Sequence, residues 1–425
     1  MANLSSRRVS RGSHAGRPDL LALAAATLLT CALAGRPAEA QVAPLPPVQG
    51  FEQPSGLAFG GFEFFTRAQA GMQLTDNIRL DPTEETDFKR IFAVNAVVRS
   101  TWKEHALAAT FGYVNQQALD LRDQKSDALT GTISGQYDFT DKFNLRVGAS
   151  SEESIIGQND PQQFNGNLNG TTQTNTLESA FGWDNKAYFL NLLGRYQDIS
   201  NDTNIDVTDL TRLQSQDREE YNLTLEAGKH YSWGQASVFG GPIRIRYSGS
   251  AFILPEDRDS DGGRAGFSIQ YQQGNLTGLF RAIGFAQYFN APTIGEVISA
   301  VGTAQLSYKI DEAWGIGGVL ERTFDETNIE TSGGLFTNLA GVAALYKPRD
   351  DVYIKVGPTY RFYQIEGTPY EAESFSLDAT VAWQVHERVE LMFNASVSNQ
   401  IVNDAFLSNL QYGETNATVS VVVTF

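Results

Sequence analysis

Strict alternation of apolar and polar side chains is the feature that most constrains this chain. Between Leu129 and Phe139 the sequence LTGTISGQYDF puts Leu129, Ile133 and Tyr137 on one file, and threonine, serine, glutamine and aspartate on the other. Side chains of a β-strand point alternately to the two faces of a sheet, so this stretch predicts a strand with one apolar and one polar face. Such a strand fits either a soluble sandwich, with its apolar face in a core, or a membrane barrel, with its apolar face in lipid.

The alternation returns along the chain from about residue 61 to the C-terminus. It is clearest in the ranges 143–149, 375–383, 389–398 and 415–425. Outside the N-terminus, no apolar run approaches the roughly 20 residues that a membrane helix needs. A content of 41% hydrophobic residues with only 14 prolines argues against general disorder. The sequence therefore predicts an all-β protein.

Short and long polar connections alternate between the predicted strands. The short ones are 103–105, 140–142, 184–186, 232–235, 273–275, 310–313, 347–351 and 385–388. The long ones are 75–87, 119–126, 153–173, 198–216, 253–264, 290–295, 325–334, 364–371 and 399–411. Short periplasmic turns at one end and long extracellular loops at the other are typical of an outer-membrane barrel. We therefore predict a transmembrane, antiparallel, up-and-down β-barrel of about 18 strands, with both ends of the barrel segment on the short-turn side.

The tryptophans give an independent indication of a membrane boundary. All five lie within or beside the short connections: Trp102, Trp183, Trp233, Trp314 and Trp383. Indole rings favour the membrane–water interface because the ring is apolar while its N–H stays hydrated. A soluble sandwich has no reason to place every tryptophan beside one set of turns, although strand propensity alone also enriches aromatic residues near strands. The pattern predicts an interface girdle at the periplasmic side.

A barrel in lipid would turn the polar files toward an enclosed lumen. The side chains assigned to the lumen are Arg67, Arg99, Arg146, Arg195, Arg244, Arg246, Glu152, Glu178, Glu226, Glu321, Lys355, Arg361 and Asp378. Two arginines, Arg281 and Arg322, fall on the lipid file in this register. Two interpretations of the inward charges stay open: they line a pore and bias it toward certain solutes, or they form a hydrogen-bonded plug.

The first 40 residues have a different character. Several arginines precede an apolar run from Leu20 to Ala34, and Ala38-Glu-Ala40 offers a small-residue cleavage site. This layout predicts a secretory signal peptide at 1–40, followed by a Pro/Gly-rich periplasmic linker at 41–60 and the barrel at 61–425. Cys31 is the single cysteine, so the mature chain would rely on burial and hydrogen bonds rather than disulfides. The expected location is the outer membrane of a Gram-negative bacterium.

No catalytic motif emerges from the chain. The net charge of −17 argues against a nucleic-acid partner, because phosphate binding needs clustered lysine and arginine. Three histidines, His105, His230 and His386, lie near short connections without metal-ligand spacing or a serine-bearing motif beside them. Barrel enzymes do exist, so an enzyme remains the least favoured of three alternatives.

One loop resembles the start of a calcium site. The stretch DRDSDG places Asp257, Asp259 and Asp261 at alternate positions before Gly262. Hard cations bind several oxygens, and a glycine permits the sharp turn of such loops. The glutamate expected at the twelfth position is replaced by Ser268. A hydrated acidic loop is the simpler interpretation, and a divalent ion that bridges the loop to lipopolysaccharide is another; no other cofactor is expected.

Several motifs together resemble the putative β-barrel porin 2 family of outer-membrane proteins. They are the strand and Asp-Asn pair in AGMQLTDNIR from Ala70, the RSTW strand end at Trp102, and the QYDFTDK hairpin from Gln136. The resemblance covers roughly residues 61–425. It implies a barrel and an association with exopolysaccharide clusters; the residue spacing does not show that association.

The leading expectation is thus an outer-membrane pore that passes hydrophilic solutes or a surface polysaccharide through a polar lumen. A structural or adhesive surface barrel with a blocked lumen is the alternative. The expected partners are outer-membrane lipid and lipopolysaccharide, polysaccharide-export proteins, and the barrel-assembly machinery, which would meet the last strand ending at Phe425.

Overall fold

A computed structural model describes residues 56–78, 85–120, 125–156, 170–203, 217–248, 258–325, 332–403 and 411–425. All of its regular elements are β-strands, and together they form one sheet. The first ten are β1 (Leu57–Phe59), β2 (Phe62–Thr75), β3 (Asp87–Ser100), β4 (Ala106–Ala118), β5 (Lys125–Asp138), β6 (Phe143–Ile156), β7 (Gly170–Asp184), β8 (Tyr188–Thr203), β9 (Arg218–Tyr231) and β10 (Gly234–Tyr247). The remaining nine are β11 (Ser260–Gln273), β12 (Leu276–Phe289), β13 (Glu296–Lys309), β14 (Trp314–Asp325), β15 (Leu335–Arg349), β16 (Val352–Ile365), β17 (Glu371–His386), β18 (Val389–Val402) and β19 (Tyr412–Thr424).

The sheet closes on itself. Each strand from β2 to β19 pairs antiparallel with the next in sequence, and β19 pairs with β2 over Asn416–Thr424. The last residue completes the seam, because Phe425 N donates to Thr66 O over 2.8 Å and Thr66 N donates to Phe425 O over 3.0 Å. Closure gives the backbone N–H and C=O groups of every strand edge a hydrogen-bond partner, and lipid offers no such partner. The prediction of an 18-stranded antiparallel barrel is therefore confirmed; β1 is an additional short strand that pairs only with β2.

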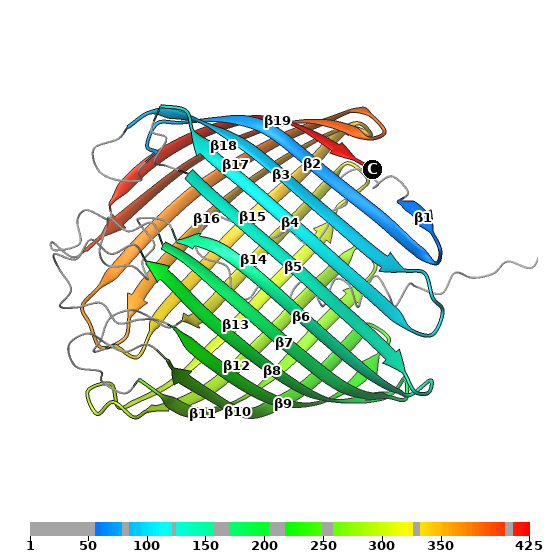
Figure 1. The fold of residues 1–425 in the computed structure, drawn as a ribbon, viewed down its shortest axis with the longest axis vertical. Coiled ribbons are helices and arrows are strands. Elements are labelled where there is room, and N and C mark those ends of the chain that lie inside the picture. The colour runs from blue at the N-terminus through cyan, green and yellow to red at the C-terminus, as the bar shows by residue number, and fades with distance from the viewer. Residues whose placement is uncertain are drawn as a thin grey trace, which may run out of the picture. The chain divides into compact units, whose positions relative to one another are not determined.

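The short turns lie at one end of the barrel, and the strand ends that lead into the longer connections lie at the other (Figure 1). The strand-to-strand turns at 232–233, 274–275, 350–351 and 387–388 have two residues each. Two glycines at these turns adopt positive φ, Gly234 at 145° and Gly274 at 57°, a backbone conformation that other residues disfavour. The C-terminus lies at the short-turn end. Among the described residues, no helix is long and apolar enough to cross a membrane.

One strand pair is incomplete. The β13–β14 ladder runs only from Gly302↔Arg322 to Lys309↔Gly315, although both strands continue toward the extracellular end and pair with their other neighbours. Arg322 partly fills the fork, since its Nε donates to the Ala300 carbonyl over 3.2 Å. An apolar cluster built on Phe289, Val297 and Phe336 packs beside it.

The predicted leader at 1–40 lies outside the described residues, as does most of the predicted linker. The five described linker residues, 56–60, contain β1. The predicted barrel start at 61 falls one residue before Phe62, the first residue of β2.

Candidate functional site: the inward face of the barrel

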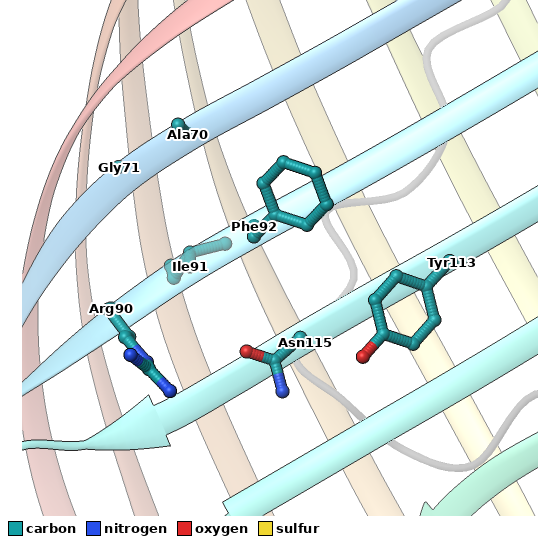
Figure 2. A pocket seen from close by; sticks show the side chains of 7 residues that line it. All are labelled: Ala70, Gly71, Arg90, Ile91, Phe92, Tyr113 and Asn115. Carbon is teal, nitrogen blue, oxygen red and sulfur yellow. The ribbon is translucent and has the colours of Figure 1, made fainter.

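Strand pairing assigns each side chain to one of the two faces of the wall, because directly opposite residues share a face. One face carries large exposed apolar side chains, such as Ile133, Leu391, Phe393 and Val419. Figure 2 looks at this outer face: Arg90, Phe92, Tyr113 and Asn115 stand on the near side of β3 and β4, and Ile91 lies behind its strand. The neighbours of these residues along each strand therefore point into the barrel.

Eleven of the thirteen predicted lumen residues lie on the inward face. They are Arg67, Arg99, Arg146, Arg195, Glu152, Glu178, Glu226, Glu321, Lys355, Arg361 and Asp378. They come from β2, β3, β6, β7, β8, β9, β14, β16 and β17, so charged groups are distributed around the whole wall. That they line an open pore stays a prediction.

Several inward charges meet a partner on a neighbouring strand. Arg99 binds Glu63, with 2.7 Å between Nη2 and Oε2, and Arg67 Nη2 lies 3.6 Å from Glu390 Oε2. On β6, Arg146 Nε donates to Gln136 Oε1 over 3.0 Å. The arginine side chains of the two ion pairs are 58% and 47% exposed, so these groups are in contact with solvent space.

The structure corrects two assignments, because Arg244 and Arg246 lie on the outward face. Arg244 stands opposite Tyr221 and Asp261. Ile243 and Ile245, which flank Arg244 in the sequence, take the inward positions. Arg244 Nε donates to Asp261 Oδ1 over 2.7 Å. The error has a physical cause: this is the extracellular end of β10, where isoleucine can pack inside the mouth and arginine can face the headgroup zone. Ten residues separate Arg244 from Gly234 at the periplasmic end, roughly 25 Å along the axis, which is the height of the apolar band.

Of the two arginines placed on the lipid file, one is also corrected. Arg281 faces inward, opposite Ser268 and Thr303. Arg322 lies on the outward file, where it donates to Ala300 O and to Asn338 Oδ1 in the β13–β14 fork. A further inward arginine, Arg264 on β11, was missed by the sequence analysis. Its neighbours Gly263 and Ala265 give no apolar file from which its face could be inferred.

All five tryptophans lie at the periplasmic ends of the strands. Trp102 and Trp233 are in turns, Trp314 begins β14, and Trp183 and Trp383 are near the ends of β7 and β17. Four have close partners there: Trp102 packs against Phe62, Trp233 stacks on Tyr231, Trp314 stacks on Tyr346, and Trp383 Nε1 donates to Asp351 Oδ2 over 3.1 Å. Their action as a membrane-interface girdle stays a prediction.

The calcium-like loop is only partly described. Asp257 lies outside the described residues. Asp261 accepts hydrogen bonds from Arg244 and Arg246, and Asp259 accepts from the Tyr247 amide over 2.8 Å. Within the described ranges, no three side chains of histidine, cysteine, aspartate or glutamate are grouped to hold a metal. Both described carboxylates are thus engaged by the protein itself, and calcium binding remains an untested expectation.

The histidines occupy structural positions near the short turns. His105 Nδ1 accepts from the Asp138 amide over 3.2 Å, and His386 Nδ1 accepts from the Arg388 amide over 3.3 Å. His230 Nε2 lies 3.1 Å from Asp184 Oδ2.

Comparison with known proteins agrees with this architecture. The sequence model of the family described as "Putative beta-barrel porin 2" matches residues 51–425. Similar solved structures include OccAB3 of Acinetobacter baumannii (12% identity, 86% of this chain and 99% of that chain, TM-score 0.48). OccK2 of Pseudomonas aeruginosa, solved with glucuronate, gives 9% identity over 86% and 98% of the two chains with a TM-score of 0.47. The FrpB iron transporter of Neisseria meningitidis gives 7% identity over 87% and 82%, also with a TM-score of 0.47. No curated protein matches the sequence.

Proposed function

This chain belongs to the putative β-barrel porin 2 family, and on that premise we propose that it forms a water-filled outer-membrane pore for hydrophilic solutes, including a surface polysaccharide. The observation that carries the proposal is the solvation of the inward charges. Arg67 and Arg99 belong to ion pairs and still leave about half of each side chain exposed, at 47% and 58%. A dry, packed interior would remove these ionised side chains from water, and that desolvation costs several kcal/mol per ion. Their exposure therefore favours a water-filled lumen.

The chemistry of the inward face suits transient binding of polar solutes. Amide and hydroxyl side chains, such as Gln136, Asn191 and Thr303, alternate with the charged groups along the wall. Weak, repeated hydrogen bonds let a solute enter and leave, whereas one tight site would retain it. Sugars present many hydroxyl groups, so a polysaccharide segment would find donors and acceptors along the whole path.

Planar-bilayer recording of the mature, refolded chain tests this proposal. We expect steady open-channel current in KCl, together with swelling of vesicles in neutral oligosaccharides. A barrel that shows heat-modifiable gel mobility, and is therefore folded, but carries no current and no sugar flux would overturn the proposal.

One observation favours the alternative, a structural barrel with a blocked lumen. At the extracellular end of β15–β18, an apolar cluster unites five buried side chains of the inward face with Tyr370 of the β16–β17 connection; the five are Leu335, Tyr363, Ile365, Ala372 and Val402. Such a cluster narrows the mouth on one side. The same recording separates the two functions, because only an open lumen conducts.

The outer surface supports the proposed membrane partners. The apolar file would contact acyl chains, and the outward polar side chains near the extracellular ends, Arg90, Arg244 and Arg246, would meet lipopolysaccharide headgroups. For assembly, we propose that the barrel-assembly machinery engages β19, whose edge is free for pairing before it joins β2. Polysaccharide-export proteins remain proposed partners at the periplasmic end.

A further inference from the structure

Three arginines on the inward face of β8, β11 and β12 differ from the other lumen charges. We call Arg195, Arg264 and Arg281 the cationic strip. Arg264 and Arg281 form no ion pair with any carboxylate of the described residues, and neither has an interaction beyond those described next. Arg195 keeps Glu178 at 3.2 Å. The buried Nε atoms of Arg264 and Arg281 lack a hydrogen-bond partner within the described ranges.

The two unpaired arginines lie along the wall, each reaching across a glycine of the next strand. Arg264 stands opposite Gly241, and its Nη2 reaches over β10 to donate to Thr224 Oγ1 on β9 at 3.0 Å. Arg281 reaches over β11, where Gly266 lies opposite Phe239, and places its guanidinium 4.6 Å from the centre of the Phe239 ring.

Besides Glu178, two further carboxylates on the inward face of β9 are engaged by other side chains. Glu226 accepts hydrogen bonds from Ser237 over 2.7 Å and from Asn191 over 3.2 Å. Glu220 is bound by Arg218 Nε at 2.8 Å. Arg264 interacts electrostatically with the positive charges of Arg281 and Arg195 and with the negative charge of Glu220. Glu178 thus pairs with Arg195, whereas Arg264 and Arg281 have no carboxylate at ion-pair distance among the described residues.

We propose that the cationic strip binds carboxylate groups of the solutes that pass through the lumen, with Arg264 and Arg281 as the principal contacts. The guanidinium fork matches a carboxylate in shape, and it remains charged at every physiological pH. The Phe239 ring lies 4.6 Å from the Arg281 guanidinium, and this ring contact uses none of the guanidinium N–H donors. A carboxylate-bearing sugar would combine this contact with hydroxyl hydrogen bonds to Thr224 and Thr303. This inference rests on the proposed pore function, because it names the class of solute.

The test is block of the KCl current by galacturonate, with galactose as the neutral control. Galacturonate is expected to reduce the current at millimolar concentration, and the double variant Arg264→Gln/Arg281→Gln is expected to raise the half-blocking concentration about tenfold. The matched control Arg99→Gln/Glu63→Gln removes an ion pair from the same face without changing the net charge, and should block like the parent chain. Heat-modifiable mobility checks that both variants fold. Equal block in the parent chain and the strip variant would overturn the proposal.

Two further arms separate the possible outcomes. Galacturonate binding to the detergent-solubilised barrel, measured by calorimetry, does not require conduction. A silent barrel that still loses galacturonate affinity in the strip variant would support the site and overturn the pore; a conducting barrel without such loss would do the reverse. Trigalacturonate in place of the monomer distinguishes the source of the carboxylate. Blocking events that last longer with the trimer than with the monomer indicate a polysaccharide, and events of equal duration indicate a small sugar acid.

Discussion

The arginines of β2–β3 and those of β11–β12 share a residue type and a face of the wall, but they differ in their surroundings. Arg99 stands directly opposite Glu63 and pairs with it at 2.7 Å. Both guanidiniums lie over a phenylalanine ring, Arg99 over Phe65 at 4.7 Å and Arg281 over Phe239 at 4.6 Å. Arg281, however, stands directly opposite Ser268 and has no ion pair with a carboxylate of the described residues. A paired arginine is a neutral feature of the lining, whereas an unpaired one attracts an anion from the lumen. Facing inward is therefore not enough to make a binding residue.

The glycines beneath the cationic strip give the largest expected effect. A Cβ at Gly241 would overlap the Leu223 carbonyl, and one at Gly266 would overlap the Ala282 carbonyl and approach Phe239 Cζ to 2.8 Å. We expect Gly241→Ala and Gly266→Ala each to lower the free energy of unfolding by about 3 kcal/mol, because backbone atoms cannot yield cheaply. Urea unfolding in vesicles, followed by tryptophan fluorescence, measures this. Gly131→Ala on β5 is the control, since nothing lies within 4 Å of its Cβ position; equal stability of all three variants would contradict the expectation.

An acidic side chain opposite Arg281 should make the two regions alike. Ser268→Glu would place a carboxylate where Glu63 stands relative to Arg99. We expect the half-blocking concentration of galacturonate to rise about tenfold, because the new carboxylate competes for the guanidinium. Ser268→Gln has the same size without the charge and should leave the block unchanged. Loss of block in both variants would point to steric exclusion instead.

The paired region should depend little on its ion pair for stability. A double-mutant cycle of Arg99→Ala and Glu63→Ala is expected to give a coupling free energy below about 1 kcal/mol, because both side chains are partly exposed to water. Unfolding in vesicles gives the four values. A coupling several times larger would mean that the pair is shielded from solvent, and would count against a wet lumen.

The smallest effect concerns the pair of Arg349 and Asp351, in the periplasmic turn between β15 and β16. Burial alone would raise the pKa of Asp351, but hydrogen bonds from Arg349 and Trp383 hold its pKa below the ordinary value of 3.8. A lowered pKa in the folded state stabilises the fold above the ordinary value, and this contribution disappears as pH falls through the folded-state pKa. Asp351→Asn should therefore be slightly less stable than the parent chain at pH 7, with a difference that vanishes in strong acid. Thermal shifts of the gel mobility transition measure it; a difference that grows toward low pH would have the wrong sign.

Alternation within strands and alternation of loop lengths were enough to predict the barrel and the faces of Arg99 and Arg146. The assignment of faces failed where the apolar side chains of a strand do not face lipid. At the extracellular end of β10, the apolar residues Ile243 and Ile245 face inward. The apolar file was taken to face lipid, so Arg244 and Arg246, which alternate with these isoleucines, were assigned to the wrong face. On β12 both files are apolar, with Phe280 and Ala282 outward and Ile283 and Phe285 inward, and Arg281 was therefore assigned to the lipid file although it faces inward.

Partner identity could not be predicted at all from one strand at a time. The ion pair of Arg99 depends on the register between β2 and β3, and the isolation of Arg264 depends on which residues β9 and β10 bring beside it. A glycine read alone signals only a weak strand position. Its role beneath a guanidinium appears once two neighbouring strands are aligned.

The reach of Arg264 and Arg281 over Gly241 and Gly266 would also affect the rate at which solutes pass through the proposed pore. A long cation that projected across the channel would narrow it, and any gain in discrimination would come with slower passage. Because these side chains lie along the wall, they project little into the lumen. In the proposed pore, a charged group would therefore be recognised at the wall while a bulky solute passes through the centre.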